Sequence, residues 1–310
     1  MKKVCVLMST YNGERYLKKQ IESILNQEDV KIHLIVRDDG STDGTIKILN
    51  SYSRQKKLIY YKGINLGPAR SFMDLLKSDY VKEEMDQDTF IAFSDQDDIW
   101  NKKKLKRATN VLSESNYKKV PAIYACNFQL IDKNDTNMPN INHVVTTDFL
   151  SSVIFSSCTG CTMVINYRLY KELVGITPNN IYMHDDWIHK VCLAIGGKVF
   201  FDSNQKNVFY RQHEDNVIGL KSNLFSKVDS YIEYLRNPKY KDRMLNEYIN
   251  IKKFYSSKIS QDNLELIDKI INYKNMSLIS RIKFTNDMCK KSNIKGFTKD
   301  FRVAMFFKRY

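Results

Sequence analysis

Short apolar runs alternate with amphipathic stretches from the start of the chain to about residue 120. Four runs rich in β-branched and aromatic residues predict buried strands, at residues 4–8, 32–36, 58–61 and 89–93. After each run comes a polar segment, and then apolar residues at helical spacing, as at residues 16–25 and 102–115. Alternating strands and helices with short connections predict an α/β fold, with a mostly parallel central sheet and helices on both faces.

The pattern changes after residue 120. Further strands are predicted at residues 122–131, 198–201 and 208–210. Between them we expect a Ser- and Thr-rich segment around Gly160 and two helices, at residues 167–174 and ending near residue 194. From residue 221 onward the spacing is helical. We therefore expect a sheet domain over residues 1–220 and a basic helical C-terminal region over residues 221–310.

Polar residues collect where the first four predicted strands end, as Ser-Thr-Tyr-Asn (9–12), Asp-Asp-Gly-Ser-Thr-Asp (38–43), Asn-Leu-Gly (65–67) and Asp-Gln-Asp-Asp (95–98). The carboxyl ends of parallel strands meet at one sheet edge, which is the usual ligand site of such folds. In a turn, Asp95 and Asp97 can converge on one hard divalent cation, Mg²⁺ or Mn²⁺, which also takes phosphate oxygens. The alternative is a solvated acidic turn in which Asp98 caps the next helix.

Composition and charge narrow the class of protein. Hydrophobic content of 43% with 11 Gly and 5 Pro is that of a globular chain. Of the net charge of +14, residues 221–310 contribute +11, from 20 Lys and Arg against 9 Asp and Glu. The six cysteines lie mostly in apolar runs, which predicts buried thiols in a reducing compartment, and the lone Cys158–Cys161 pair does not make a zinc motif. With no secretory signal and no bilayer-spanning run, we expect a cytoplasmic protein.

These motifs, followed by His-Asp-Asp-Trp at residues 184–187, together resemble glycosyltransferase family 2 over about residues 1–220. Members are inverting, nucleotide-sugar-dependent enzymes of the GT-A (Rossmann-like) fold. Ser-Asp-Gln-Asp-Asp-Ile-Trp at residues 94–100, with Tyr-Arg-Gln-His at 210–213 and Asn216, looks most like the rhamnosyltransferase branch of bacterial surface-polysaccharide synthesis. The resemblance implies a dTDP- or UDP-sugar donor and a glycan acceptor carried on a polyprenyl lipid.

The resemblance also implies roles for single residues. Asp97 would hold the metal, and Asp95 would reach the sugar, the ribose or the metal through water. Asp39 would accept a hydrogen bond from the base. The residues expected to bind the nucleotide sugar are Thr10, Tyr11, Asn12, Glu14, Asp38, Asp39, Asn65, Gly67, Arg70, Asp95 and Gln96. His213 is a candidate third metal or diphosphate ligand, with a purely structural hydrogen bond as the alternative.

An inverting transfer needs one carboxylate that deprotonates the acceptor hydroxyl in a single displacement. The family pattern puts this base at Asp185, and Asp186 stays open as the alternative. Acids favoured by the dipole of a helix start would be the structural explanation of the pair. Candidate acceptor-site residues are Gly160, His184 and Trp187, although Trp187 suits a core position equally well and the segment around Gly160 suits a tight turn.

Other classes fit less well. A dinucleotide-dependent oxidoreductase would carry GxGxxG after its first strand, and neither that motif nor a Walker loop is present. No nucleic-acid motif accompanies the basic tail, so we expect no nucleic acid partner. A non-catalytic nucleotide-sugar-binding or scaffold component of a polysaccharide-synthesis complex is the alternative. In the tail, Phe and Met alternate with Lys and Arg over residues 294–310, which predicts either peripheral docking on an anionic membrane or packing within the protein or in a homo-oligomer.

Overall fold

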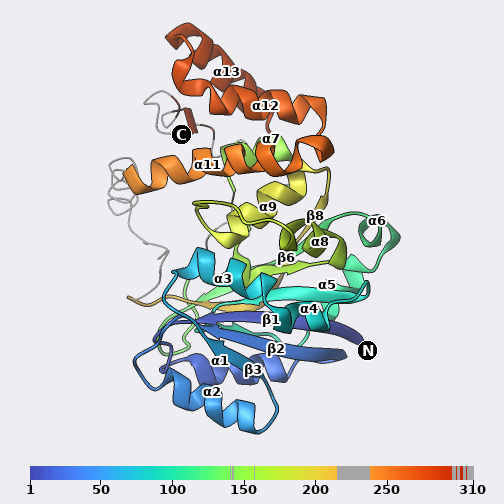
Figure 1. Ribbon diagram of the computed structural model, residues 1–310, viewed down its shortest axis with the longest axis vertical. Helices are drawn as coiled ribbons and strands as arrows, with labels where there is room; N and C mark the ends of the chain where they lie inside the picture. Colours follow the sequence, from blue (N-terminus) through green and yellow to red (C-terminus); the bar gives the residue numbers. More distant parts are fainter. Residues whose placement is uncertain are drawn as a thin grey trace.

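The computed structural model describes residues 1–139, 141, 143–156, 158–214, 238–294, 298, 301, 302 and 305. Within these residues eight strands form one mixed, mostly parallel sheet in the order β3-β2-β1-β4-β7-β6-β8-β5 (Figure 1). The strands are β1 (Lys2–Thr10), β2 (Val30–Asp38), β3 (Ile59–Lys62), β4 (Thr89–Ser94), β5 (Ile99–Trp100), β6 (Ala122–Ile131), β7 (Met163–Ile165) and β8 (Lys198–Arg211). This is the α/β, GT-A-like architecture that the sequence predicts.

Helices cover both faces of the sheet because the strands bury alternate side chains on opposite sides. Along β1, Val4, Val6 and Met8 join one core cluster, whereas Cys5 and Leu7 join the other. The first cluster includes apolar residues of α1 (Leu17–Leu25), α2 (Thr45–Arg54) and α5 (Lys104–Leu112). The second includes residues of α3 (Pro68–Lys77), α4 (Asp79–Glu84), α7 (Phe149–Ile154), α8 (Tyr167–Val174) and α9 (His184–Ala194). A further short helix is α6 (Ser115–Lys118).

The parallel half of the sheet brings the predicted polar loops together. β1 pairs in parallel with β2 and β4, and β2 with β3. The register sets Thr10 opposite Asp38, and Met8 opposite Ser94. The loops that follow β1, β2 and β4 therefore leave the sheet at the same edge, as expected from the sequence.

Several elements differ from the sequence prediction. β8 is one strand instead of two, because it continues through an exposed polar middle section while β6 pairs with it across a register shift at Asn127. The segment expected as a Ser- and Thr-rich stretch contains α7, the 3₁₀ turn η1 (Gly160–Thr162) and β7. Short elements of this kind depend on their pairing partners, here β4 and β6 for β7, more than on local periodicity.

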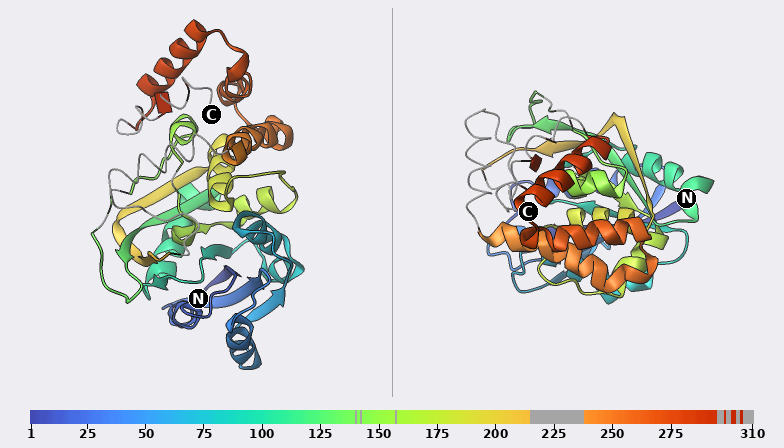
Figure 2. Two further views of the ribbon diagram at one scale, coloured as in Figure 1. Left: turned by 90° about the vertical axis from the view of Figure 1, so that its left-hand side faces the viewer. Right: turned by 90° about the horizontal axis from the view of Figure 1, so that it is seen from above.

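The C-terminal region is helical, as predicted. It comprises α11 (Pro238–Tyr255), η2 (Ser256–Lys258), α12 (Gln261–Ile271), η3 (Tyr273–Asn275) and α13 (Leu278–Lys291). Figures 1 and 2 show α11 beside α9, with α12 and α13 stacked beyond it, away from the sheet. Tyr248, Ile251 and Tyr255 of α11 belong to the same buried cluster as the α9 side of the sheet.

Parts of the tail and of the expected domain boundary cannot be compared with the structure. The boundary between residues 220 and 221 lies outside the described residues, as do Asn216 and most of the aromatic tail (Phe297, Phe306, Phe307 and Tyr310). Phe301 and Met305 are buried in the shared core, which agrees with the packing alternative for these two positions. All six cysteines are buried free thiols, as predicted. Among the described residues, no helix combines the length and apolar character needed to cross a membrane.

Candidate active site

The loop after β2 is built around Asp38. This buried carboxylate accepts hydrogen bonds from Thr10 Oγ1 (3.2 Å) at the end of β1 and from the N–H groups of Gly40 (3.2 Å) and Ser41 (3.0 Å). Gly40 has a φ of 88°, which a glycine adopts without strain. Asp38 and Thr10 thus fix the conformation of the loop, and their side chains are buried beneath it.

Asp39 connects the loops that follow β2 and β3. It is buried, pairs with the Arg37 guanidinium, and accepts hydrogen bonds from the N–H groups of Leu66 (2.8 Å) and Gly67 (2.9 Å). Gly67 has a φ of 76° and precedes Pro68, the first residue of α3. Arg37 also binds Asp74 of α3 at 2.9 Å. These bonds fix Asp39 at the sheet edge, and its expected contact with the nucleotide base stays a prediction.

The loop after β1 is fastened to the loop after β2 by two side chains. Asn12 Oδ1 accepts from the Thr42 N–H at 2.8 Å, and Glu14 Oε2 accepts from the Gly44 N–H at 2.8 Å. Asn12 adopts a left-handed φ of 49°, a conformation that Asn tolerates. One side-chain oxygen of each residue thus holds the loops together, while both residues remain exposed.

Gln96 fastens the acidic turn to the loop after β1. Its Oε1 accepts from the Tyr11 N–H at 2.9 Å and its Nε2 donates to the Tyr11 carbonyl at 3.0 Å. The side chains of Tyr11, Asn65 and Arg70 are exposed on these loops. Asn12 and Glu14 of the predicted set are exposed as well. Thr10, Asp38 and Asp39 are buried and mainly build the loops.

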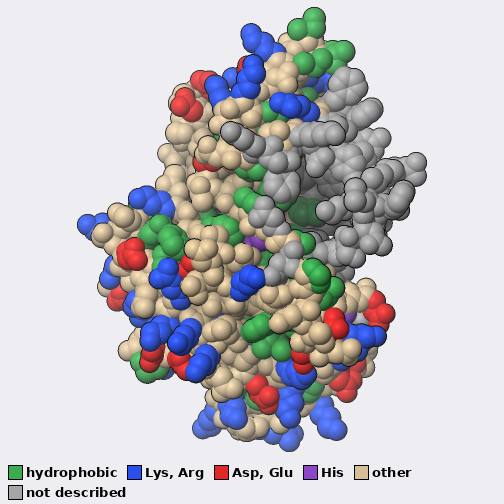
Figure 3. All heavy atoms as spheres, turned by 180° about the vertical axis from the view of Figure 1, so that it is seen from behind, with side chains coloured by type: hydrophobic (Ala, Val, Ile, Leu, Met, Phe, Trp, Pro, Cys, Tyr) green, Lys and Arg blue, Asp and Glu red, His purple; other side chains and the backbone are tan. Residues whose placement is uncertain are grey.

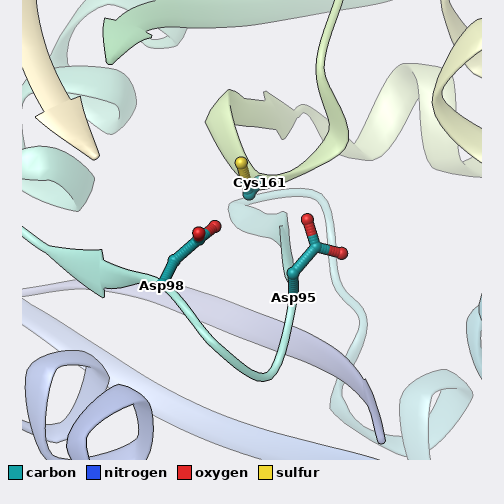
Figure 4. A group of neighbouring side chains, drawn as sticks. All are labelled: Asp95, Asp98 and Cys161. Atoms are coloured by element: carbon teal, nitrogen blue, oxygen red, sulfur yellow. The ribbon is translucent and has the colours of Figure 1, made fainter. Parts of the chain in front are cut away.

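The acidic turn between β4 and β5 presents three carboxylates. Asp97 Oδ2 lies 2.7 Å from Nε2 of His213, which follows β8. Asp98 is fully buried and accepts from the Arg211 N–H at 3.1 Å, so it does not cap the next helix. Asp95 and Asp98 both point toward Cys161 of η1 (Figure 4).

The carboxylates of the turn crowd one another. Burial, and then the charges of Asp97 and Asp185, raise the pKa of Asp95 to about 7. Burial, with Asp97 and Asp95 beside it, also holds the pKa of Asp98 well above its usual range. Crowded carboxylates of this kind favour a bound cation. The oxygens of Asp95 and Asp97 suit Mg²⁺ or Mn²⁺. The imidazole of His213 suits a transition-metal ion better than Mg²⁺, and the Cys161 sulfur is a soft ligand that suits neither Mg²⁺ nor Mn²⁺.

Two buried cations near the turn had no role in the sequence prediction. Lys104 of α5 has no exposed surface, and its Nζ donates to the Cys161 carbonyl at 2.6 Å. Burial lowers the pKa of Lys104 to about 8. Arg211 is also fully buried, and its Nε donates to the Asp97 carbonyl at 2.7 Å. A lysine on the apolar face of a predicted helix was the sequence signal for Lys104, and Arg211 lies inside the Tyr-Arg-Gln-His motif.

The two acids at the start of α9 have different surroundings. Asp185 accepts from two main-chain donors, the N–H groups of Gly160 (2.8 Å) and Asp186 (2.9 Å). Burial, and then the neighbouring Asp186, raise its pKa to about 6. Asp186 instead receives Lys190 Nζ at 2.7 Å. Burial opposes the ionisation of Asp186, but Lys190 outweighs it and the pKa of Asp186 is lowered.

The remaining acceptor candidates are Gly160, His184 and Trp187, which lie near Asp185 in the sequence or in space. His184 is buried, stacks on Phe72 at 3.9 Å between ring centroids, and has a pKa that burial lowers to about 3. Gly160 approaches His184 so closely that a Cβ would lie 2.7 Å from Nε2. Trp187 is fully buried, with its ring centroid 6.4 Å from that of Tyr255 in α11. Of the two alternatives for Trp187, the structure agrees with the core position, because its side chain has no exposed surface.

Comparisons with known proteins agree with this arrangement. Residues 5–173 match the model of the family described as Glycosyl transferase family 2. The chain is 31% identical to dTDP-rhamnosyl transferase RfbG of Shigella flexneri over 227 residues, 68% of this chain and 73% of that protein. It is 27% identical to the putative teichuronic acid biosynthesis glycosyltransferase TuaG of Bacillus subtilis over 211 residues, 67% of this chain and 78% of that one.

A solved structure shares the fold. S. aureus TarS 1–349 in complex with UDP superposes with a TM-score of 0.55 at 18% identity, covering 98% of this chain and 89% of that chain. The sheet, its converging loops and the matched sequence lead to one conclusion. The chain belongs to glycosyl transferase family 2 and is a glycosyltransferase of the GT-A fold.

Proposed function

We propose that the protein is an inverting enzyme that transfers a sugar from a dTDP- or UDP-sugar to a hydroxyl of a growing, lipid-linked cell-surface glycan. Rhamnose is the sugar that the similarity to RfbG supports, and the similarity to TuaG supports a polysaccharide product. The observation that carries the proposal is Asp185. Within the described part of the chain its carboxylate accepts hydrogen bonds from main-chain N–H groups, and it lies beside the acidic turn.

The donor would bind over the loops that follow β1, β2 and β3. Asp39 has one Oδ2 lone pair beyond its bonds to Arg37, Leu66 and Gly67, which suits the N3–H of a thymine or uracil base. The exposed Arg70 lies on α3, one turn after Gly67, and is available to the diphosphate. The hydrogen bonds of Asp38, Asp39, Asn12 and Glu14 hold these loops in place.

Asp97 and His213 would hold the divalent metal, with Asp95 directly or through water. In the structure His213 Nε2 and Asp97 Oδ2 are hydrogen-bonded at 2.7 Å, and a metal held by both atoms would replace this hydrogen bond. When bound, Mg²⁺ or Mn²⁺ neutralises the charge that develops on the leaving nucleoside diphosphate. Arg211 and Gln96 would keep the turn in place through Asp97 and Tyr11.

Asp185 would take the proton of the acceptor hydroxyl as that oxygen attacks the sugar. The N–H groups of Gly160 and Asp186 orient its carboxylate, and a pKa of about 6 leaves it ionised yet still basic near neutral pH. Asp186 is less suited to the role, because Lys190 neutralises it and lowers its pKa.

The test compares Asp185→Asn with Asp186→Asn and with the matched control Asp262→Asn, an exposed acid in the first turn of α12. A thermal-shift panel of dTDP-, UDP- and GDP-sugars with Mn²⁺ or Mg²⁺ first identifies the donor. We expect Asp185→Asn to bind that donor normally and to lose about 10²-fold or more in nucleoside diphosphate release. An active Asp185→Asn beside an inactive Asp186→Asn would identify the other acid as the base, and a wild type inactive with every donor would favour the scaffold alternative.

A lipid-linked acceptor would require the enzyme to work at a membrane surface. At the N-terminal end of α13 three aliphatic side chains are exposed, Leu278 (49%), Ile279 (81%) and Ile282 (45%), next to Arg281 and Lys283. Figure 3 shows hydrophobic and basic side chains together at this end of the molecule. Apolar side chains flanked by cations suit the headgroup layer of an anionic membrane. We therefore extend the proposal to peripheral membrane contact through α13.

A further inference from the structure

A buried charge cluster ties the start of α9 to the C-terminal helix α11. Lys190 Nζ donates to Asp186 Oδ2 at 2.7 Å and to Glu247 Oε2 at 2.8 Å, and the side chains of Lys190 and Glu247 have no exposed surface. Glu247 Oε1 accepts a hydrogen bond from the Tyr182 N–H at 2.8 Å. One side chain from α11 thus contacts both the segment that leads into α9 and a lysine further along that helix.

The cluster is what makes Asp185 and Asp186 different. Among the described residues, Lys190 is the cation that pairs with Asp186. Asp186 also forms hydrogen bonds with Glu247 and with the uncharged Ser156. Without Glu247, Lys190 loses one of its two anchors and Tyr182 loses the acceptor of its N–H. Asp186 would then be held less firmly. Because Asp185 is the preceding residue, its position would change as well.

Stability does not explain why this contact is ionic. Buried ion pairs lose in desolvation about what they gain in attraction, and apolar side chains of similar volume often replace them without cost. The α9–α11 contact already has an apolar core, because Tyr248, Ile251 and Tyr255 are buried there. A charged cluster in this place is better explained by the orientation it imposes on its neighbours.

We propose that Glu247 is a positioning residue for Asp185. It holds Lys190 against Asp186 and fixes the backbone at Tyr182, and so keeps the Asp185 carboxylate at its place at the start of α9. This inference rests on the proposed function, in which Asp185 is the base. The helix α11 then belongs to the support of the active site, although it lies in the C-terminal region of the sequence.

The test uses three variants and one control. Glu247→Leu removes the contacts of Glu247 with Lys190, Tyr182 and Asp186. The pair Lys190→Met with Glu247→Leu also removes the cation, so that no buried lysine is left unpaired. Glu247→Gln keeps an acceptor for Tyr182 and a polar group beside Lys190. The control is Glu172→Gln, because Glu172 of α8 pairs with Lys258 of η2 at 2.5 Å and thus also links the C-terminal region to the sheet domain, but away from Asp185.

We measure kcat for nucleoside diphosphate release from the donor identified above, together with the Kd of that donor by calorimetry, on variants that melt cooperatively. A misplacement of about 1 Å costs on the order of 10²-fold in rate, so we expect a 10- to 100-fold loss of kcat in the double variant with an unchanged donor Kd. Glu247→Gln should stay within about threefold of wild type, and Glu172→Gln should match wild type.

The outcomes separate the two proposals. If Asp185→Asn is inactive and the folded double variant has the kcat of wild type, the positioning role of Glu247 is overturned while the base assignment stands. If Asp185→Asn is as active as wild type, the base assignment fails whatever Glu247 does. A double variant that loses donor affinity as much as kcat would also overturn the proposal, because Glu247 would then support the fold of the whole site.

Discussion

Gly160→Ala is expected to damage catalysis through a single methyl group. The Cβ would lie 2.7 Å from Nε2 of His184 and 3.4 Å from the Cβ of Asp185. The Gly160 N–H donates to Asp185 Oδ2 at 2.8 Å, so the residue that must move is the one that orients the carboxylate.

The size of the effect follows from the packing. Nonbonded atoms rest about 3.5 Å apart, so the added methyl group needs roughly 0.8 Å of displacement. His184 has little room to yield, because its ring stacks on Phe72 at 3.9 Å and lies 5.5 Å from Phe93. The backbone of η1 should therefore shift and draw its N–H away from Asp185. We expect about 1–3 kcal/mol less stability, as for other overpacked sites, and a 10- to 100-fold lower kcat.

The assay pairs urea denaturation with kcat at saturating donor. The control is Gly175→Ala at the end of α8, where φ is −80° and a Cβ would have no atom within 4 Å. That variant should be as stable as wild type or more stable by about 0.4–1 kcal/mol, with an unchanged rate. Equal stability and equal kcat in the two alanine variants would refute the reasoning about the contact between Gly160 and His184.

Three other predictions follow from the site and from α13. Asp97→Ala should keep the fold but lose the Mn²⁺-dependent affinity for nucleoside diphosphate, and equal calorimetric affinities with Mn²⁺ would exclude the metal role. Burial raises the pKa of Asp185 to about 6, and the base must be unprotonated, so kcat should fall as the pH drops through about 6. A kcat that does not change between pH 5 and 8 would argue against Asp185 as the base. The wild type should sediment with anionic liposomes and not with neutral ones, and high salt should weaken this binding. Ile279→Asp should also weaken it. If Ile279→Asp binds anionic liposomes as well as the wild type does, the membrane contact lies elsewhere.

The sequence by itself determined the alternation of parallel strands and helices in the first half, and the sheet edge at which the polar loops gather. Apolar runs of five residues followed by helical spacing leave few choices besides parallel strands with crossover helices, and parallel strands end at one edge. Asp38, Asp95 and Thr10 meet there for that reason, as the register of β1 with its two neighbours shows. Local periodicity was sufficient for the central strands β1 and β4 because most of their residues are buried, whereas the edge strand β3 has no buried residue.

Only the tertiary structure decided how the acids at the site differ. Asp185 and Asp186 are neighbours in sequence with the same side chain, and what separates them is Lys190 together with Glu247, 57 residues further along the chain. The contact between Asp97 and His213 likewise joins residues 116 positions apart. Burial also placed Trp187 in the core, where its ring lies near Tyr255 of α11. A carboxylate's pKa and an aromatic ring's accessibility depend on what packs around them, and that surrounding comes from segments whose spacing along the chain carries no local signal.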